Sequence, residues 1–286
     1  MQWQRLKPWR PALPRAEATR SLPLIVFLGV AEQKADLALL AQHPLQGVCP
    51  VCQQSACFRG FTDNLRESGH CDQCGSFNRQ RQLAHVMRQR LPFVGQGCWP
   101  FPPGFSIYNT ESTGALHKAL LAAQRPDTQY QFSEYFGPQH EPGSFVGEVR
   151  HESLEALSFS AESFDLVLSS DVLEHLPKPY VAHTEILRVL KPGGRHLFTV
   201  PCDLMMARDD VRASLHEGEV VYHADKLFHG DPVRPDEGIL VWTIFGQQML
   251  ARMTEMGYSM TAWVLQAPEL GIIGDHAIVF EARKPG

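Results

Sequence analysis

The stretch SFDLVLSSDVLEHLPKPYVAHTEILRVLKPGGRHLFTVP, residues 163–201, carries the alternation that decides the fold. Its first part, FDLVLSS (164–170), is an almost continuous apolar run, as in a strand that is buried on both faces. YVAHTEILRVL (180–190) predicts a helix, and KPGG is expected to stop it because glycine commonly ends helices. RHLFTVP (195–201) then predicts the next strand. A strand, a helix and a strand in this order indicate a parallel sheet covered by helices.

The same alternation extends from this stretch towards the N-terminus. Strands are expected at 105–109, 130–133 and 145–150, and a helix is expected at 114–123. A proline- and glycine-rich segment, 95–104, separates this part of the chain from the segment before it. The sequence therefore predicts an α/β fold, and in such sheets ligands bind beyond the carboxyl ends of the strands.

The stretch 163–201 resembles the central segment of the class I S-adenosylmethionine-dependent methyltransferases, of the type 11-like kind. The resemblance rests on the apolar strand after FD, the EHL turn, and the helix that ends in RVLKPGG before the next strand. LEALSF (154–159) is similar to the family's approach to that strand, and the tail resembles its last helix and closing antiparallel hairpin. The resemblance implies a seven-stranded Rossmann-like methyltransferase domain over residues 105–286, with an insertion or lid at 201–240.

The resemblance also implies where S-adenosylmethionine binds. In YNTESTG (108–114), Gly114 stands at the last glycine of the family's cofactor loop, and Glu111 is expected to bind the amino group of the cofactor. Glu134 falls at the position of the acid that binds the ribose hydroxyls. Residues expected around the adenine and the methionine end are Glu152, Ser153, Leu154, Ser170 and Asp171.

The cofactor loop departs from the family's pattern at three positions. Thr110 and Ser112 stand where glycines are expected, and Tyr108 stands at the usual acid position. Either the loop is reshaped and still holds the cofactor, or the fold has lost its cofactor. We favour a reshaped loop, because the stretch 163–201 keeps the family's pattern.

Four cysteines form two C-x-x-C pairs, Cys49/Cys52 and Cys71/Cys74, within a predicted module at 49–94. This spacing is typical of a zinc ion held by four thiolates, and a closed four-ligand shell indicates a structural ion. A redox site would have a single pair at the start of a helix. The module is similar to the small N-terminal zinc-binding segments of some bacterial methyltransferases.

The segment after the second cysteine pair, SFNRQRQLAHVMRQRL (76–91), predicts a helix that Ser76 caps. Its apolar residues Leu83, Val86/Met87 and Leu91 recur at helical spacing. We expect its arginines to lie on a solvated face, with RNA or an anionic substrate as the alternative partner. These arginines are Arg79, Arg81, Arg88 and Arg90.

Three histidines are candidates for the base that an oxygen or nitrogen acceptor needs. His175 lies in the EHL turn, and His223 and His229 lie in the insertion. A structural role is the alternative for each of them. A second metal site formed by His223, His229 and Asp231 is a weaker alternative.

The composition narrows the functional classes. The chain has 286 residues and a formal net charge of −5, which does not favour a nucleic-acid partner. The apolar run at 22–30, within an N-terminal extension at 1–48, is too short to span a membrane, and we expect a buried strand rather than a signal peptide. We therefore expect a cytoplasmic protein without a membrane partner, in which the seven cysteines are better explained as metal ligands and free thiols than as disulfides.

Three functions remain open. We favour a methyltransferase that acts on a small-molecule or glycan-like acceptor and carries a structural zinc ion. An RNA methyltransferase that binds nucleic acid through the zinc module is the first alternative. A non-catalytic scaffold that keeps the fold without the cofactor is the second. Neither the acceptor nor the oligomeric state follows from the sequence.

Overall fold

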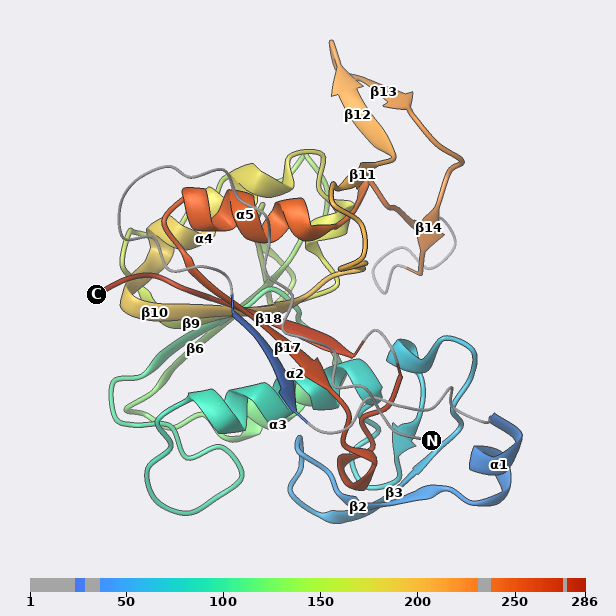
Figure 1. The fold of residues 1–286 in the computed structure, drawn as a ribbon. Helices are drawn as coiled ribbons and strands as arrows, with labels where there is room; N and C mark the ends of the chain where they lie inside the picture. The colour runs from blue at the N-terminus through green and yellow to red at the C-terminus, as the bar shows by residue number, and fades with distance from the viewer. Residues whose placement is uncertain (1–23, 29–36, 231–237, 275–276) are drawn as a thin grey trace.

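The computed structural model describes residues 24–28, 37–230, 238–274 and 277–286. A nine-stranded sheet forms its centre, with strands in the order β1-β17-β18-β10-β9-β5-β6-β8-β7 (Figure 1). The strands are β1 (Leu24–Leu28), β5 (Ser106–Asn109), β6 (Gln129–Glu134), β7 (Phe145–Val146), β8 (Val149–His151), β9 (Phe164–Ser170), β10 (Leu190–Thr199), β17 (Ser259–Leu265) and β18 (Ile278–Arg283).

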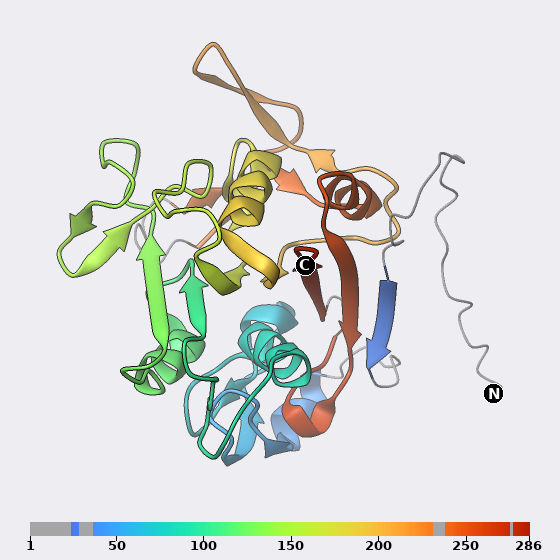
Figure 2. The same ribbon diagram turned by 90° about the vertical axis from the view of Figure 1, so that its left-hand side faces the viewer.

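The strands between β8 and β10 are parallel, and β18 runs antiparallel to both β10 and β17. This mixed sheet confirms the predicted Rossmann-like α/β fold with its closing antiparallel hairpin. Strands β1 and β7 add one strand at each edge, and Figure 2 shows β1 beside β17. The single strand predicted at 145–150 is wrong, because the chain forms a hairpin there, in which β7 pairs antiparallel with β8.

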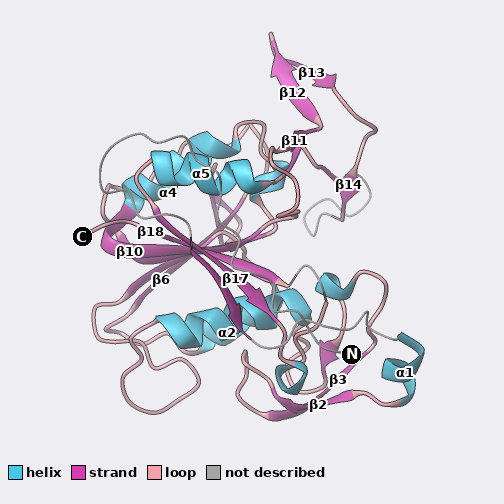
Figure 3. Cartoon of the chain, viewed as in Figure 1, coloured by secondary structure: helices cyan, strands magenta, loops and turns pink. Residues whose placement is uncertain are grey.

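Helices cover both faces of the sheet. Helices α4 (Pro179–Val189) and α5 (Gln247–Glu255) lie on one face, and α2 (Asn78–Arg90) and α3 (Gly114–Ala122) lie on the other (Figures 1 and 3). Because successive side chains of a strand point to opposite faces of the sheet, one strand contributes residues to both cores. In β9, Leu166 and Leu168 join the core under α2 and α3, whereas Val167 joins the core under α4 and α5.

Helix α4 ends before the KPGG segment rather than at it. The chain is already extended at Leu190, which pairs with Phe164 in the parallel ladder between β9 and β10. The segment 191–194 forms an irregularity within β10, where Gly193 has a φ of +77°. The predicted helix end is thus confirmed to within one residue of KPGG, whereas the strand begins earlier than the predicted residue 195.

The cysteine-containing segment packs against the same face as α3. It consists of a small sheet, α2 and the turn η1 (Leu65–Glu67). Its Phe58 and Leu83 lie in one core with Ile107 and Leu166 of the large sheet. A Cβ at Gly47 would overlap the carbonyl oxygen of Glu269, so only glycine allows this close approach. The remaining elements here are α1 (Leu37–Gln42), β2 (Leu45–Val48), β3 (Ser55–Arg59), β4 (His70–Cys71) and η3 (Pro268–Leu270).

Helix α2 buries two of its four arginines and exposes Arg90. Arg79 is 8% exposed and Arg81 is 0% exposed, because the helix lies between the small sheet and the large one. Arg88 donates to the carbonyl oxygens of Pro50 and Cys98, and Arg90 pairs with Glu281. The predicted solvated face is thus wrong for Arg79 and Arg81, whereas Arg90 is exposed and the predicted apolar face is buried as expected.

The segment after β10 forms short antiparallel pairs. The hairpin of β12 and β13 projects from the body of the molecule (Figure 1). Residues 231–237, including the candidate ligand Asp231, lie outside the described part. No helix in the described ranges is long and apolar enough to cross a bilayer. The elements here are η2 (Leu173–His175), β11 (Asp210–Val211), β12 (Ala213–His216), β13 (Glu219–Tyr222), β14 (Phe228–His229), β15 (Ile239–Leu240) and β16 (Thr243–Ile244).

Candidate functional site

The loops at the carboxyl ends of β5, β6 and β9 bring several predicted cofactor residues together. Glu134, at the end of β6, accepts hydrogen bonds from the backbone N–H of Ser112 (3.3 Å) and from its hydroxyl (2.9 Å). Ser112 belongs to the cofactor loop after β5, which also carries Glu111 and Gly114. We call the region where these loops meet α2 the crevice.

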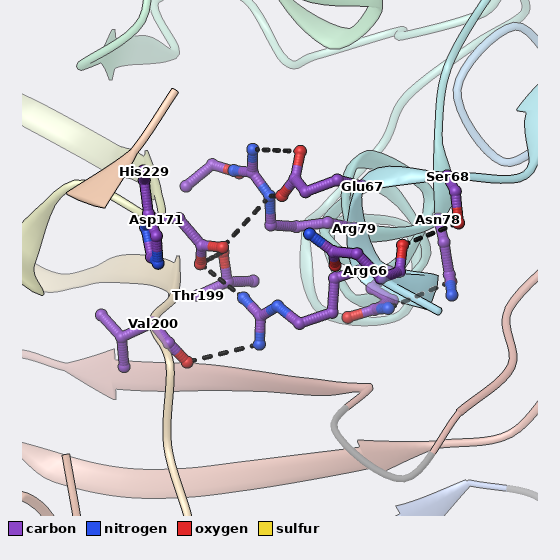
Figure 4. Close-up of polar contacts among 12 residues, drawn as sticks. Arg66, Glu67, Ser68, Asn78, Arg79, Asp171, Thr199, Val200 and His229 are labelled. Atoms are coloured by element: carbon purple, nitrogen blue, oxygen red, sulfur yellow. Dashed lines mark hydrogen bonds and ion pairs between the residues drawn. The ribbon is translucent and has the colours of Figure 1, made fainter. Parts of the chain in front are cut away.

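Figure 4 shows the Arg79 side chain of α2 extending towards Asp171 and Glu67. Its guanidinium donates to the Ser170 hydroxyl and lies 3.4 Å from Asp171 and 3.8 Å from Glu111. It also pairs with Glu67 at 2.5 Å. Burial disfavours the charge, but the surrounding carboxylates raise the pKa of Arg79, so the group stays cationic. A residue of the cysteine module thus lies where the resemblance places the cofactor's methionine end.

A second arginine of the module, Arg66, holds Asp171. Its guanidinium lies 2.5 Å from the Asp171 carboxylate, which also accepts a hydrogen bond from the Thr199 hydroxyl at 2.9 Å (Figure 4). Burial acts to raise the pKa of Asp171, but Arg66 and Arg79 outweigh it and the pKa is lowered. Asp171 therefore remains ionised at neutral pH and joins the large sheet to the module.

The positive charge of Arg79 only partly offsets the cost of burying the Glu111 carboxyl. Burial raises the pKa of the Glu111 carboxyl to about 7, and Arg79 counteracts this only in part. Gly114 begins α3 with a φ of +85°, and a Cβ there would overlap the side-chain amide nitrogen of Gln80. The positive φ is what favours glycine here, because the Gln80 side chain could move aside.

Two buried side-chain oxygens of the crevice have no hydrogen-bond partner among the described residues. They are Oγ1 of Thr110, in the loop after β5, and Oε1 of Gln80, whose amide lies against Gly114. Buried polar groups in native proteins are nearly always hydrogen-bonded. Two such oxygens beside a loop that the resemblance assigns to a cofactor fit a polar ligand there.

The three residues expected around the adenine have different surroundings. The Glu152 side chain is fully buried, and it accepts hydrogen bonds from Arg150 at 2.7 Å and from the Ser158 backbone N–H at 2.9 Å. Ser153 forms a single β-bridge with Ala156, and Leu154 lies in the core under α4 and α5. The carboxylate of Glu152 is therefore already occupied by the protein's own donors.

Two of the three candidate histidines lie together, next to a glutamate that the sequence did not single out. Glu174 has a side chain with 0% exposure, and both carboxylate oxygens lack a hydrogen-bond partner among the described residues. Its Oε1 lies 3.7 Å from Nε2 of His175 and 3.7 Å from Nδ1 of His229. Burial raises the pKa of Glu174 well above its ordinary value.

The third candidate, His223, is exposed beyond β13, where its Nε2 lies 2.8 Å from the Ser214 hydroxyl. It does not join the group formed by Glu174, His175 and His229. Figure 4 shows His229 beside Asp171.

The four cysteines predicted as metal ligands come together. Their sulfur atoms all lie within 4.8 Å of one another, and Cys49 and Cys74 are 3.7 Å apart. Sulfurs bound about 2.3 Å from one tetrahedral ion are separated by nearly this distance. All seven cysteines have free thiols, and Cys57, Cys98 and Cys202 lie outside the group. The arrangement is compatible with a zinc module.

Ser76 and Arg81 form the surroundings of these thiols. The Ser76 hydroxyl lies 3.3 Å from the Cys49 sulfur and 3.2 Å from the Cys74 sulfur. Helix α2 begins at Asn78 without a side-chain cap, so the predicted cap by Ser76 is wrong. Arg81 is buried over the ring of Phe58 and donates to the carbonyl oxygen of Gly271 at 2.8 Å. A buried guanidinium offsets the negative charge that four thiolates around a divalent cation leave.

The sequence did not reveal Arg66, Arg79 and Glu174 as residues of the site. Arg79 was expected on an exposed face, because spacing alone does not show which side of a helix another layer covers. Glu174 stands in the EHL motif, but in that motif the sequence marks only the histidine as a candidate base. Arg66 lies in a loop with no recognisable motif.

The sheet, the crevice and the loop after β5 define an α/β domain of the class I methyltransferase type. Residues 114–198 match the model of a family described as "Methyltransferase domain". This segment contains α3, β6, β9, α4 and most of β10, whereas α2 and β5 lie before it.

Curated relatives match a shorter part of the chain. An uncharacterized methyltransferase of Mycobacterium marinum is 48% identical over 60 residues, or 20% of this chain and 22% of that protein. Another, of Mycobacterium tuberculosis strain H37Rv, is 51% identical over 53 residues, or 18% of this chain and 19% of that protein. The chain thus spans about a fifth of the length of these relatives.

A similar solved structure is the Burkholderia thailandensis 1,6-didemethyltoxoflavin-N1-methyltransferase with its bound substrate and S-adenosylhomocysteine. It is 16% identical with a TM-score of 0.42, and the match covers 73% of this chain and 79% of that one.

Proposed function

We propose that the chain is an S-adenosylmethionine-dependent methyltransferase that acts on a small-molecule or glycan-like acceptor and carries a structural Zn²⁺ ion. The observation that carries the proposal is the pair formed by Arg79 and Glu111, which places opposite charges 3.8 Å apart in the crevice. The amino-acid end of S-adenosylmethionine is itself a zwitterion. A cation and an anion at this separation suit its carboxylate and its ammonium group.

Different residues of the crevice would bind different parts of the cofactor. Arg79 would bind the carboxylate, because a guanidinium forms strong charge-assisted hydrogen bonds with such groups. Glu111 would bind the ammonium group, which compensates a carboxyl whose pKa burial raises to about 7. Glu134 would bind the ribose hydroxyls in exchange for the bonds that it now accepts from Ser112. The unpartnered oxygens of Thr110 and Gln80 would gain a polar neighbour.

The bound cofactor would supply the activated methyl group, and the protein would position it and exclude water. Arg66 and Arg79 together join the module to Asp171 at this edge of the sheet. A zinc ion at Cys49, Cys52, Cys71 and Cys74 would therefore act indirectly. It would fix the start of α2, and through α2 it would fix the position of Arg79. The acceptor would bind on the side of Asp171 where Glu174, His175 and His229 lie.

The surroundings of α2 support a small acceptor over RNA. Arg79 and Arg81 are buried, and Arg88 and Arg90 have partners within the protein. RNA binding needs arginines that can reach phosphates, and the net charge of −5 adds a repulsive background. The module would therefore serve as a wall of the cofactor site rather than as a nucleic-acid surface.

One observation favours a second candidate, the non-catalytic scaffold. Arg79 lies within the crevice and is held there by Ser170, Asp171 and Glu67. If this network is permanent, the side chain excludes the cofactor instead of binding its carboxylate.

Calorimetric titration of the full chain with S-adenosylhomocysteine separates the two candidates. The methyltransferase proposal expects binding that Glu134→Gln weakens at least tenfold, because the amide loses the charged contact with the ribose. Glu148→Gln, an exposed change in the turn between β7 and β8, serves as the matched control and should bind like the wild type. Absence of binding at millimolar concentration would rule out the methyltransferase and leave the scaffold.

A further inference from the structure

We propose that Glu174, His175 and His229 bind one divalent transition-metal cation, separate from the site formed by the four cysteines. The three residues come from two parts of the chain. Glu174 and His175 lie in η2 after β9, and His229 lies in β14 of the insertion. The β14–β15 pairing brings the insertion back to η2, because His175 contacts the carbonyl oxygen of Leu240 in β15.

The separations of the candidate ligand atoms suit a single cation. Oε1 of Glu174 lies 3.7 Å from Nε2 of His175 and 3.7 Å from Nδ1 of His229, and the three atoms lie within 4.8 Å of one another. A cation about 2.0–2.2 Å from nitrogen and oxygen ligands leaves the ligand atoms roughly 3–4 Å apart. Small side-chain movements would bring the three ligand atoms to one cation.

The burial of Glu174 gives an independent reason to expect a ligand. Its side chain has 0% exposure, and neither carboxylate oxygen has a hydrogen-bond partner within the described ranges. A buried carboxyl without a partner costs free energy, and a cation removes that cost. The distances of 3.7 Å to both histidines are too long for hydrogen bonds, so the histidines do not satisfy the carboxyl directly.

The ring of His175 is oriented by a contact typical of metal-binding histidines. Its Nδ1 lies 2.9 Å from the carbonyl oxygen of Leu240, which requires the proton to be on Nδ1. This tautomer turns the lone pair of Nε2 towards Glu174. Backbone carbonyls commonly fix metal-binding histidines in this way. A divalent cation between Nε2 and the Glu174 carboxylate would accept a lone pair from each of them.

The donor set indicates the class of metal. Two imidazole nitrogens and one carboxylate oxygen suit Zn²⁺, Mn²⁺, Fe²⁺ or Co²⁺ rather than the thiolate-selective ions. Three protein ligands leave coordination positions open, which is typical of a site that binds a substrate or water. With the proposed methyltransferase function as a premise, the open side would bind an oxygen of the acceptor and lower its pKa. His175 and His229 would then be ligands rather than bases.

The experiment uses Mn²⁺ as the probe, because thiolates bind it poorly and the cysteine site stays loaded with zinc. Free Mn²⁺ is measured by electron paramagnetic resonance during titration of the full chain. We expect one Mn²⁺ per wild-type chain, and at least tenfold weaker binding for Glu174→Gln and for His229→Ala. Glu174→Gln keeps the shape of the buried side chain, and His229 is half-buried, so both variants should fold.

His223→Ala is the matched control, because it removes a histidine from the same insertion but outside the group. It should bind Mn²⁺ as tightly as the wild type does. The inference is overturned if the wild-type chain binds no Mn²⁺, or if Glu174→Gln binds it equally well. Titration of the same variants with S-adenosylhomocysteine keeps the two proposals apart, since loss of the metal site alone leaves binding at Glu111 and Glu134 intact.

Discussion

The guanidinium of Arg79 on helix α2 lies 3.8 Å from the carboxylate of Glu111 in the loop after β5. This contact joins the cysteine module to the crevice of the large sheet. The two residues are 32 positions apart (111 − 79) and belong to segments that the sequence predicts as separate units. The pair makes the module part of the proposed cofactor site.

Arg79→Gln should weaken the binding of S-adenosylhomocysteine about 10- to 100-fold in calorimetric titration. The variant loses a charge-assisted hydrogen bond to the ligand carboxylate, which contributes about 1.5–3 kcal/mol. Arg59→Gln, an exposed change in the same module, should leave the affinity unchanged. Tighter binding by Arg79→Gln would instead mean that the arginine competes with the cofactor for the crevice.

Glu111→Gln should stabilise the ligand-free chain at alkaline pH. An unfolded glutamate has a pKa of about 4.3, whereas burial raises the pKa of Glu111 to about 7. Between these values the folded chain holds a proton that the unfolded chain has lost, so the stability falls as the pH rises through this window. The variant removes this cost, and its free energy of unfolding at pH 8 should exceed that of the wild type by roughly 1–3 kcal/mol.

Urea unfolding of both proteins at pH 8 and at pH 5 measures the effect, and the difference should shrink at pH 5. A variant that is less stable than the wild type at pH 8 would show that the contact with Arg79 outweighs the desolvation of Glu111.

Cys71→Ser should remove the bound zinc and destabilise the whole chain by several kcal/mol, because metal binding contributes directly to folding. The module shares its core with the large sheet through Phe58 and Leu83, so a single unfolding transition should move to lower temperature. Elemental analysis and thermal unfolding measure the two effects. Cys57→Ser, outside the group, should keep its zinc and shift the midpoint little. Separate transitions for module and sheet would contradict the shared core.

Glu152→Ala should lower stability more than cofactor affinity. The Glu152 side chain is fully buried and accepts hydrogen bonds from Arg150 and Ser158. Its loss leaves the Arg150 charge without its partner, which costs about 3–5 kcal/mol for a buried pair and less here, since Arg150 is partly exposed. Chemical unfolding and titration with S-adenosylhomocysteine measure the two quantities. A large loss of affinity in a fully folded variant would restore Glu152 as an adenine-binding residue.

The sequence by itself determined the order of strands and helices, because hydrophobic periodicity is a local property. It also determined the group of four thiols, because the spacing of the two cysteine pairs fixes two turns that present sulfur. The position of Glu134 at the end of its strand followed from the same pattern, and the structure brings it to the cofactor loop.

Only the tertiary structure decided which face of α2 is buried and what its arginines contact. Arginine on a helix is exposed in most contexts, and no local pattern shows that Arg79 enters a crevice lined by Glu111 and Asp171. The same holds for Glu174, whose two histidine neighbours lie 1 and 55 residues further along the chain (175 − 174 and 229 − 174). Contacts between distant segments depend on how layers pack, and packing is a property of the whole chain.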